Sequence, residues 1–236
     1  MRPIEKEAVL ADKDMVKTYT KYQNAKRDLI DQIGNYCVYC NMRLPTSLAV
    51  EHVQPKKRQG HLELSWDNFL LACINCNSSK GNKDINETNL NDYYWPDIHN
   101  THLAFIYLND GRVEVNTNLT HAQQMKAKET LDLVGLQKYP DTEDASDSRW
   151  KDRKEAYQQA TRFVTLLHEC TQTGSRSQAI EFICTCAIDK GFFSIWFSVF
   201  EAHDDVKVAL IAAFKGTANC FDMTDHYRPI PRTADL

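Results

Sequence analysis

The stretch CVYCNMRLPTSLAVEHVQPKKRQGHLELSWDNFLLACINCNSSK, residues 37–80, decides the fold of this chain. It contains two C-x-x-C pairs: Cys37 with Cys40, and Cys73 with Cys76. Each two-residue spacing lets a tight turn direct two thiolates at one ion, and two such pairs are the ligand set of a tetrahedral zinc site. A redox motif would need only one pair. The four cysteines therefore predict a structural zinc that leaves no coordination position for substrate.

The same stretch contains side chains suited to acid–base chemistry and to binding a hard cation. Glu51 and His52 end the run LAVEH, Asn68 precedes the second pair, and Asn77 directly follows its last cysteine. A carboxylate, an imidazole and amide oxygens supply the ligands and the base that one-metal phosphodiester hydrolysis requires. Taken alone, His52 is interpreted as a hydrogen-bonded structural residue. Its setting among cysteines and asparagines favours catalysis. The alternative is a zinc adaptor that binds protein or nucleic acid without turnover, and an adaptor has no need for this set.

Apolar periodicity predicts the elements of the N-terminal half. Residues 11–33 have apolar side chains three, four or seven apart, which indicates an amphipathic helix that ends at Gly34. The cysteine-bearing stretch is interpreted as strand, loop, short strand and helix. THLAFIYL and RVEV flank a turn made by Asn109, Asp110 and Gly111, which predicts a β-hairpin. We expect these elements to form one domain over residues 1–120.

The C-terminal half has a helical pattern. Helices are expected over residues 121–136, 149–171, 176–190 and 192–214, so residues 121–236 form a predicted helical lobe and the fold class is α+β. The run FFSIWFSVF at 192–200 is interpreted as a buried helix, with a partner surface as the alternative. The tail from Lys215 is expected to be extended and loose. Core packing is expected for the other four cysteines, which are Cys170, Cys184, Cys186 and Cys220.

The net charge, the apolar runs and the cysteine content limit the functional classes to which this chain can belong. The net charge of −4 argues against holding nucleic acid by bulk electrostatics, so a nucleic-acid enzyme would need local positive charge or a partner. The opening MRPIEKEAVL lacks the apolar stretch of a secretory signal, and the sequence contains no run long enough to span a membrane. We therefore expect a cytoplasmic protein whose eight cysteines are not disulfide-bonded.

The strings CVYC, EH, WDN and CINCNSSKG resemble the HNH nucleases of ββα-metal fold, in the variety in which two C-x-x-C pairs bracket the motif. This resemblance implies that His52 is the general base, that Glu51 and Asn77 bind the catalytic cation, and that Asn68 holds the loop carrying His52. Adjacent residues of a regular strand point to opposite faces, so the strand must end or distort at Glu51 and His52 for both to serve one site.

Two departures from the family pattern concern the cation. Many relatives have Asp where Glu51 stands, and Asn77 occupies a position that is His in the family signature. Carboxylate and amide oxygens suit Mg²⁺ or Mn²⁺, so we expect a hard catalytic cation distinct from the zinc. Lys80 lies three residues past Asn77 and is predicted to reach a phosphate. The basic run Lys56, Lys57 and Arg58 either contacts phosphate or forms a solvated loop, and His61 is expected at the surface.

Longer strings, among them EHVQPK, DYYWPD and ETLDLVGL, resemble the PtuB family over roughly the first 140 residues. These are nuclease subunits of Septu anti-phage systems, which also act beside retrons. The resemblance implies an ABC-type ATPase partner of the PtuA kind, through which a retron RNA or DNA complex could be engaged, and we expect the helical lobe to bind it. It leaves duplex DNA, single-stranded DNA and structured RNA such as tRNA open as substrates, with DNA the usual substrate of the family.

Overall fold

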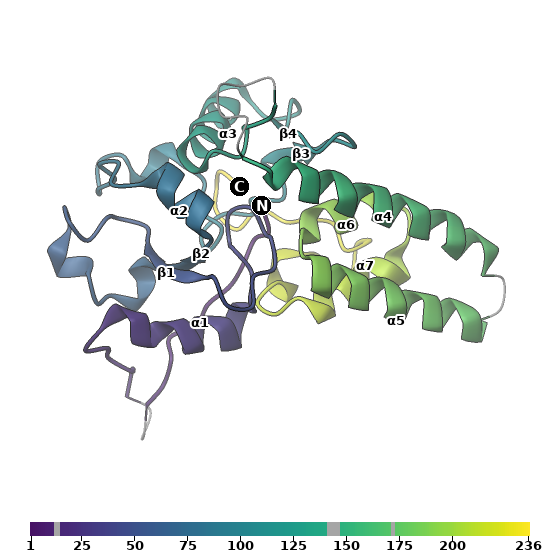
Figure 1. Ribbon diagram of the computed structural model, residues 1–236, viewed down its shortest axis with the longest axis horizontal. Helices are drawn as coiled ribbons and strands as arrows, with labels where there is room; N and C mark the ends of the chain where they lie inside the picture. Colours follow the sequence, from purple (N-terminus) through teal and green to yellow (C-terminus); the bar gives the residue numbers. More distant parts are fainter. Residues whose placement is uncertain (12–14, 141–146, 171–172) are drawn as a thin grey trace.

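The computed structural model describes residues 1–11, 15–140, 147–170 and 173–236. Its centre is a pair of short antiparallel strands followed by a helix (Figure 1). Strand β1 (Ala49–His52) pairs with β2 (Phe69–Ala72), so that His52 lies opposite Phe69. Helix α2 (Ile74–Lys80) follows at once, and the Cys73 sulfur accepts a hydrogen bond from the Cys76 amide at its first turn. The expected strand, loop, strand and helix are confirmed.

The N-terminal helix is shorter than its apolar periodicity predicts. Helix α1 covers Ala25–Ile33, preceded by one 3-10 turn at Tyr22–Asn24, and ends at Gly34 as expected. The described residues before it are extended, and Tyr19 stacks on Trp66 with ring centroids 5.9 Å apart. Only α1 has a continuous buried face. The helical spacing further upstream was therefore wrong for the described residues: Tyr19 is buried by its contact with Trp66 and Met15 is exposed, while residues 12–14 of the expected helix lie outside the described chain.

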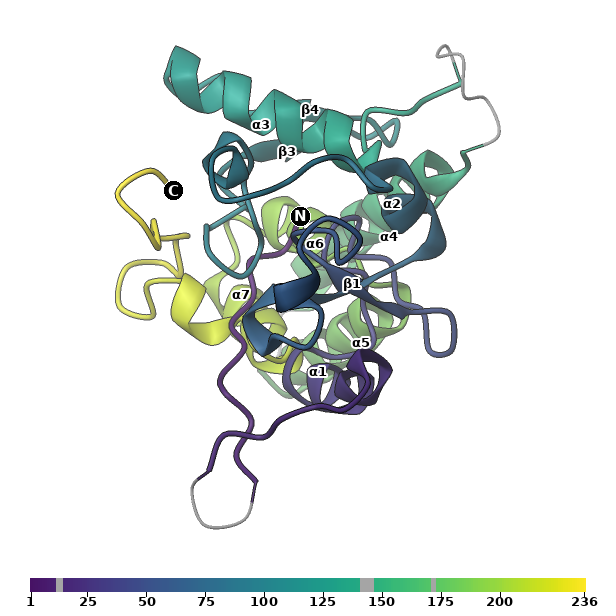
Figure 2. The ribbon, with the colours of Figure 1, turned by 90° about the vertical axis from the view of Figure 1, so that its left-hand side faces the viewer.

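The predicted hairpin is confirmed as β3 (Phe105–Tyr107) and β4 (Val113–Val115). Its turn requires glycine at Gly111, where φ is +96° and a Cβ would lie 2.1 Å from the Trp150 carbonyl oxygen. Helix α3 (His121–Val134) follows, and Thr120 with Gln123 forms its capping box. Figure 2 shows α3 lying across α2 and the hairpin.

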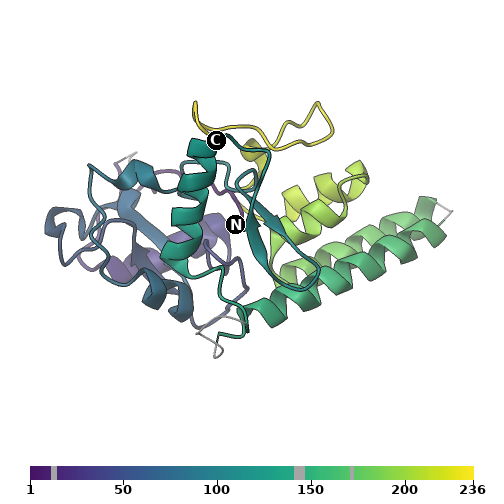
Figure 3. The same ribbon diagram turned by 90° about the horizontal axis from the view of Figure 1, so that it is seen from above.

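The remaining helices form a lobe that extends away from the strands. They are α4 (Arg149–Glu169), α5 (Thr173–Lys190), α6 (Phe193–Val199) and α7 (Asp204–Ala213). Helices α4 and α5 project side by side in Figures 1 and 3. The run FFSIWFSVF lies in the lobe's core, where Phe193, Trp196 and Phe200 have no exposed surface. Core packing is confirmed, although the expected helix 192–214 is two helices, with a break between Val199 and Asp204.

Two hydrophobic cores divide the chain. The first joins α1, the β1–β2 pair, α2, the hairpin and α3, and the second joins α4 to α7. Helix α3 thus packs with the N-terminal elements, whereas the boundary expected at residue 120 placed it with the lobe. That boundary stays a prediction about folding units. Of the four remaining cysteines, Cys220 is fully buried and Cys170, Cys184 and Cys186 are half-buried.

The C-terminal tail is not loose. The Asn100 amide donates to the carbonyl oxygens of Cys220 and Ile230, at 2.7 and 2.9 Å, and Leu236 is buried in the first core. The expectation failed because the sequence of the tail has no periodicity and its partners lie more than 100 residues away. No helix among the described residues has the length and apolar content needed to cross a membrane.

Candidate active site and zinc centre

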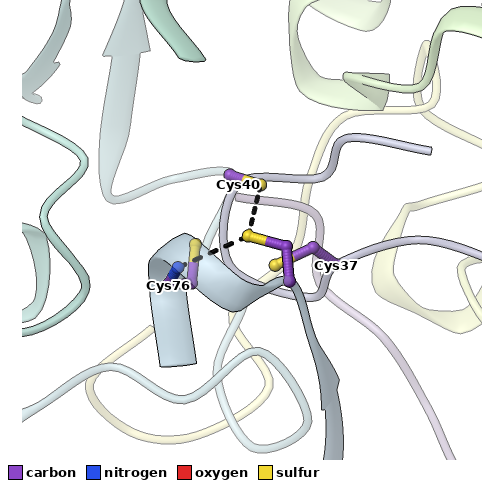
Figure 4. Close-up of side chains that lie close together, drawn as sticks. Cys37, Cys40 and Cys76 are labelled. Atoms are coloured by element: carbon purple, nitrogen blue, oxygen red, sulfur yellow. Dashed lines mark hydrogen bonds between the residues drawn. The ribbon is translucent and has the colours of Figure 1, made fainter. Parts of the chain in front are cut away.

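Four cysteine sulfurs meet in a buried cluster between the two C-x-x-C turns. The sulfurs of Cys37, Cys40, Cys73 and Cys76 all lie within 4.8 Å of one another. Figure 4 shows Cys37, Cys40 and Cys76 directed toward a common centre. Sulfurs placed tetrahedrally around zinc are about 3.8 Å apart when each Zn–S bond is roughly 2.3 Å. The Cys40 and Cys73 sulfurs are 3.8 Å apart, so the cluster fits a zinc ion.

The electrostatics of the cysteine cluster also favour binding of a cation. Burial raises the pKa of the Cys76 thiol well above its usual value, because a thiolate is poorly solvated there. One divalent ion offsets this cost for all four thiolates. The four cysteines would fill all four positions of a tetrahedral zinc ion and leave no place for a substrate, which is the ligand set of a structural site.

A second cluster surrounds a pocket of about 150 Å³ between β1, its following loop and α2. Glu51 and His52 reach it from the last two positions of β1, and Asn77 reaches it from α2. The strand ends at His52, as expected for adjacent residues that serve one site. Tyr22, Lys56 and Lys80 also line the pocket.

His52 is held as a neutral imidazole. Its Nε2 lies 3.0 Å from the carbonyl oxygen of Glu63, and a carbonyl can only accept, so Nε2 carries the proton and Nδ1 can receive one. Burial lowers the pKa of His52 below its usual value. The rings of Tyr22 and Phe69 pack against the imidazole edge-on, at 4.9 and 5.3 Å between centroids. A fixed, unprotonated imidazole in a pocket is suited to act as a general base.

Glu51 is a buried carboxylate with two partners. Its Oε2 accepts a hydrogen bond from the Tyr39 hydroxyl at 2.9 Å, and its Oε1 lies 2.6 Å from the Lys80 ammonium. Burial raises the pKa of Tyr39 well above its usual value, so the phenol remains a donor. The side-chain amide of Asn77 makes no hydrogen bond with the described residues. Glu51 and Asn77 together offer oxygen ligands to a hard cation, and such cations commonly complete their shell with water and substrate phosphate.

Comparison with known proteins identifies this arrangement. The family model for HNH endonucleases matches residues 37–83, from the first zinc cysteine to just beyond α2. Residues 37–83 are an HNH endonuclease domain. The chain is also 39% identical over 62 residues to the Septu protein PtuB of Bacillus thuringiensis. That alignment covers 25% of this chain and 24% of the relative, so the similarity spans about a quarter of the relative's length.

Asn68 supports the loop that follows His52 from behind the pocket. Its Oδ1 accepts from the Gln54 amide at 2.8 Å, and its Nδ2 donates to the carbonyl oxygens of Gln54 and Leu62 at 3.0 and 3.2 Å. These bonds fix both ends of the loop that follows His52. Asn68 does not line the pocket with His52. The geometry suits the loop-holding role that the sequence predicts.

The basic residues of the HNH domain have different surroundings. Lys56 lies over the Tyr22 ring, with its nitrogen 3.9 Å from the ring centroid, at the pocket wall. Lys57 and Arg58 are exposed, and His61 is exposed as expected. Lys80 is not placed as the sequence suggests: its side chain is 2% exposed and also donates to the His52 carbonyl oxygen at 2.7 Å. Because it is buried against Glu51, it stabilises the pocket from inside and does not extend toward solvent.

Sequence reasoning missed two residues of the site. Tyr39 lies inside the CVYC string, so its closeness to Glu51 follows from the zinc turn, and this signal was available. Tyr22 was assigned to a helix distant from the pocket. Its place beside His52 depends on how α1 packs on the strands, which no local pattern reveals.

Proposed function

We propose that this chain is a metal-dependent endonuclease that hydrolyses phosphodiester bonds of nucleic acid. The observation that carries the proposal is the convergence of Glu51, His52 and Asn77 on one pocket within an HNH domain. A zinc adaptor would need the four cysteines alone. The buried carboxylate and the neutral imidazole are costly features for a purely structural module.

His52 is the proposed general base. Nδ1 receives a proton from the attacking water, while the Nε2 bond to Glu63 keeps the imidazole in the accepting tautomer. Glu51 and Asn77 are the proposed ligands of Mg²⁺ or Mn²⁺, and such a cation would stabilise the charge that develops on the scissile phosphate. Tyr39 orients the Glu51 carboxylate through its hydroxyl.

The proposed substrate path runs along the open side of the pocket. Lys56 is half-exposed at the wall, and the exposed Lys57 and Arg58 follow it. Tyr22 lies beside Lys56, whose ammonium covers one face of its ring, and the ring is partly exposed. Cations contact phosphates without regard to sequence, and an aromatic face can stack on a base. DNA is the first substrate to test, with structured RNA such as tRNA as the second.

The test is digestion of supercoiled plasmid DNA and total RNA by purified protein in Mg²⁺, in Mn²⁺ and in EDTA, with His52→Ala run beside the wild-type. Cleavage that needs the divalent ion and His52 supports the proposal, and the substrate that is cut identifies the nucleic acid. If the protein retains zinc but cuts neither substrate, alone or with an ATPase partner, the chain is a non-catalytic zinc adaptor and the proposal is wrong.

The similarity to a Septu protein supports a role as an effector of anti-phage defence. Within that role, the proposed location is the cytoplasm and the proposed partner is an ABC-type ATPase of the PtuA kind. In systems that contain a retron, this ATPase would link the chain to the retron RNA or DNA complex. The stretch Glu51–Glu87 contains five cationic and five acidic side chains, so the lone chain is expected to grip nucleic acid weakly. An ATPase would supply that grip.

The helical lobe is the proposed docking site for the ATPase. FFSIWFSVF cannot form the interface core because it is buried. Leu166 on α4 and Phe182 on α5 are 50% and 59% exposed on the projecting pair of helices. Co-purification of tagged ATPase with Leu166→Glu and Phe182→Glu variants tests this site, with Met125→Glu on α3 as a control of similar exposure. Unchanged co-purification with both lobe variants would place the docking surface elsewhere.

A further inference from the structure

The cysteine cluster belongs to the first hydrophobic core, and the helical lobe is hydrogen-bonded to it at two points. Arg149, the first residue of α4, donates from Nη1 to the Cys76 sulfur at 2.9 Å. It is 2% exposed, and its two Nη atoms also donate to the carbonyl oxygens of Val134 and Gly135, at 3.1 and 2.6 Å. One guanidinium therefore binds a metal ligand, the end of α3 and the start of the lobe.

The other C-x-x-C turn is joined to the lobe as well. Asn41 follows Cys40 directly, and its carbonyl and side-chain oxygens accept hydrogen bonds from the amides of Phe192 and Phe193, at 2.8 and 2.7 Å. The approach is close: a Cβ on Gly191 would lie 2.4 Å from the Asn41 carbonyl oxygen. Both halves of the zinc-binding motif thus touch the lobe, one at the start of α4 and one at the turn between α5 and α6.

We propose that Arg149 is a positioning residue of the zinc centre and that bound zinc fixes the helical lobe on the HNH domain through it. Four thiolates around one divalent zinc carry net negative charge, and a buried guanidinium hydrogen-bonded to a thiolate compensates part of it. Asp147 pairs with Arg149 at 2.6 Å and orients the guanidinium from the opposite side. Without zinc the Cys76 side chain is no longer held at its ligand position, so loss of zinc is expected to weaken the hydrogen bond that anchors α4.

Arg153 provides a matched control. It lies one turn further along α4 and is equally buried, but it donates to the carbonyl oxygens of Gly111 and Leu136, and no hydrogen bond joins it to a cysteine sulfur in the described chain. Arg149→Met and Arg153→Met each remove a buried guanidinium, and both should lower the thermal midpoint. Of these two substitutions, only Arg149→Met removes a hydrogen-bond donor to a zinc ligand.

The first measurement is zinc affinity by competition with a chromogenic chelator. Arg149→Met is expected to bind zinc about 10- to 100-fold more weakly, as is usual when a group bonded to a metal ligand is removed. Arg153→Met is expected to change zinc affinity far less, and Arg149→Lys, which keeps one donor, should fall between Arg149→Met and wild-type. Wild-type zinc affinity in folded Arg149→Met, or equal losses in Arg149→Met and Arg153→Met, would overturn the proposal.

The second measurement uses wild-type protein and needs no variant to fold. Amide hydrogen exchange is compared with zinc bound and after its removal by chelator. Faster exchange in the first turns of α4 and at residues 191–193 is expected, with little change at the far ends of α4 and α5. Unchanged exchange at the start of α4 would refute the coupling. Neither measurement involves nuclease activity, so the result is independent of the proposed function.

Discussion

The Lys80 ammonium lies 2.6 Å from Glu51 Oε1, and the two side chains are 2% and 1% exposed. Lys80 also donates to the carbonyl oxygen of His52, so one cation binds the carboxylate and the backbone of the proposed base. A buried ion pair costs much desolvation, and removing one partner leaves an uncompensated charge. Lys80 therefore has an electrostatic role inside the pocket, and a divalent cation that binds Glu51 would take over part of it.

Lys80→Met is expected to lower the free energy of unfolding by about 3 kcal/mol in EDTA, because the Glu51 carboxylate loses its partner. Addition of Mg²⁺ or Mn²⁺ should restore more stability to this variant than to wild-type. Thermal unfolding with and without the ions measures both effects. Lys83→Met is the control, since Lys83 is about half-exposed and its contacts are with Glu129 at 3.8 Å and with the Tyr93 ring, away from Glu51. Equal ion effects in Lys80→Met and wild-type would argue against Glu51 as a ligand.

His52→Ala is expected to reduce cleavage by roughly two to four orders of magnitude, the usual contribution of a general base. Zinc content should be unchanged because the imidazole does not contact the cysteines. His61→Ala serves as control: His61 lies in the same loop region but is exposed. Single-turnover cleavage rates and elemental analysis provide the two readouts. A folded His52→Ala protein that cuts normally would disprove the assignment.

Asn68→Ala removes three hydrogen bonds to the loop after His52. We expect a loss of about 1–3 kcal/mol in unfolding free energy, because the partly buried Gln54 and Leu62 backbone groups lose a partner. Cleavage should fall as well, since the loop positions His52. The same substitution at Asn82, an exposed residue at the pocket rim, should leave stability nearly unchanged. Chemical denaturation gives the stability difference, and normal cleavage by Asn68→Ala would show that the loop needs no such support.

Cys37→Ser should release zinc and lower soluble yield, because three thiolates cannot complete the tetrahedral site. Cys186→Ser, at a half-buried position on α5, should retain a full complement of zinc. Elemental analysis of both purified proteins measures the metal. The zinc interpretation fails if wild-type protein contains no zinc, or if Cys37→Ser binds it as tightly as wild-type does.

Local patterns in the sequence were sufficient to predict the secondary structure and the cysteine cluster of the HNH core. The two C-x-x-C spacings, the run ending in His52 and the helix after Cys73 each depend on neighbours a few residues apart, and the structure has all three. The loop-holding role that the family resemblance implied for Asn68 also agrees with its contacts. Short-range geometry determined the two cysteine turns, the strand that ends at His52 and the helix after Cys73.

Long-range packing determined the features that local sequence patterns did not predict. Apolar spacing could not show that the described residues before Tyr22 are not helical, since Tyr19 is buried against Trp66 and not along a helix face. The charge of Lys80 suggested a phosphate, but the tertiary structure turns it toward Glu51.

The sequence by itself determined a zinc-binding ββα module with a His52 pocket and a helical second half. Only the tertiary structure decided that Arg149 meets Cys76, 73 residues away in the chain, and that Tyr22 forms a wall of the pocket. The physical reason is that spacing and alternation specify a segment's own conformation, whereas the partner of a buried charge or ring is set by how whole elements pack together.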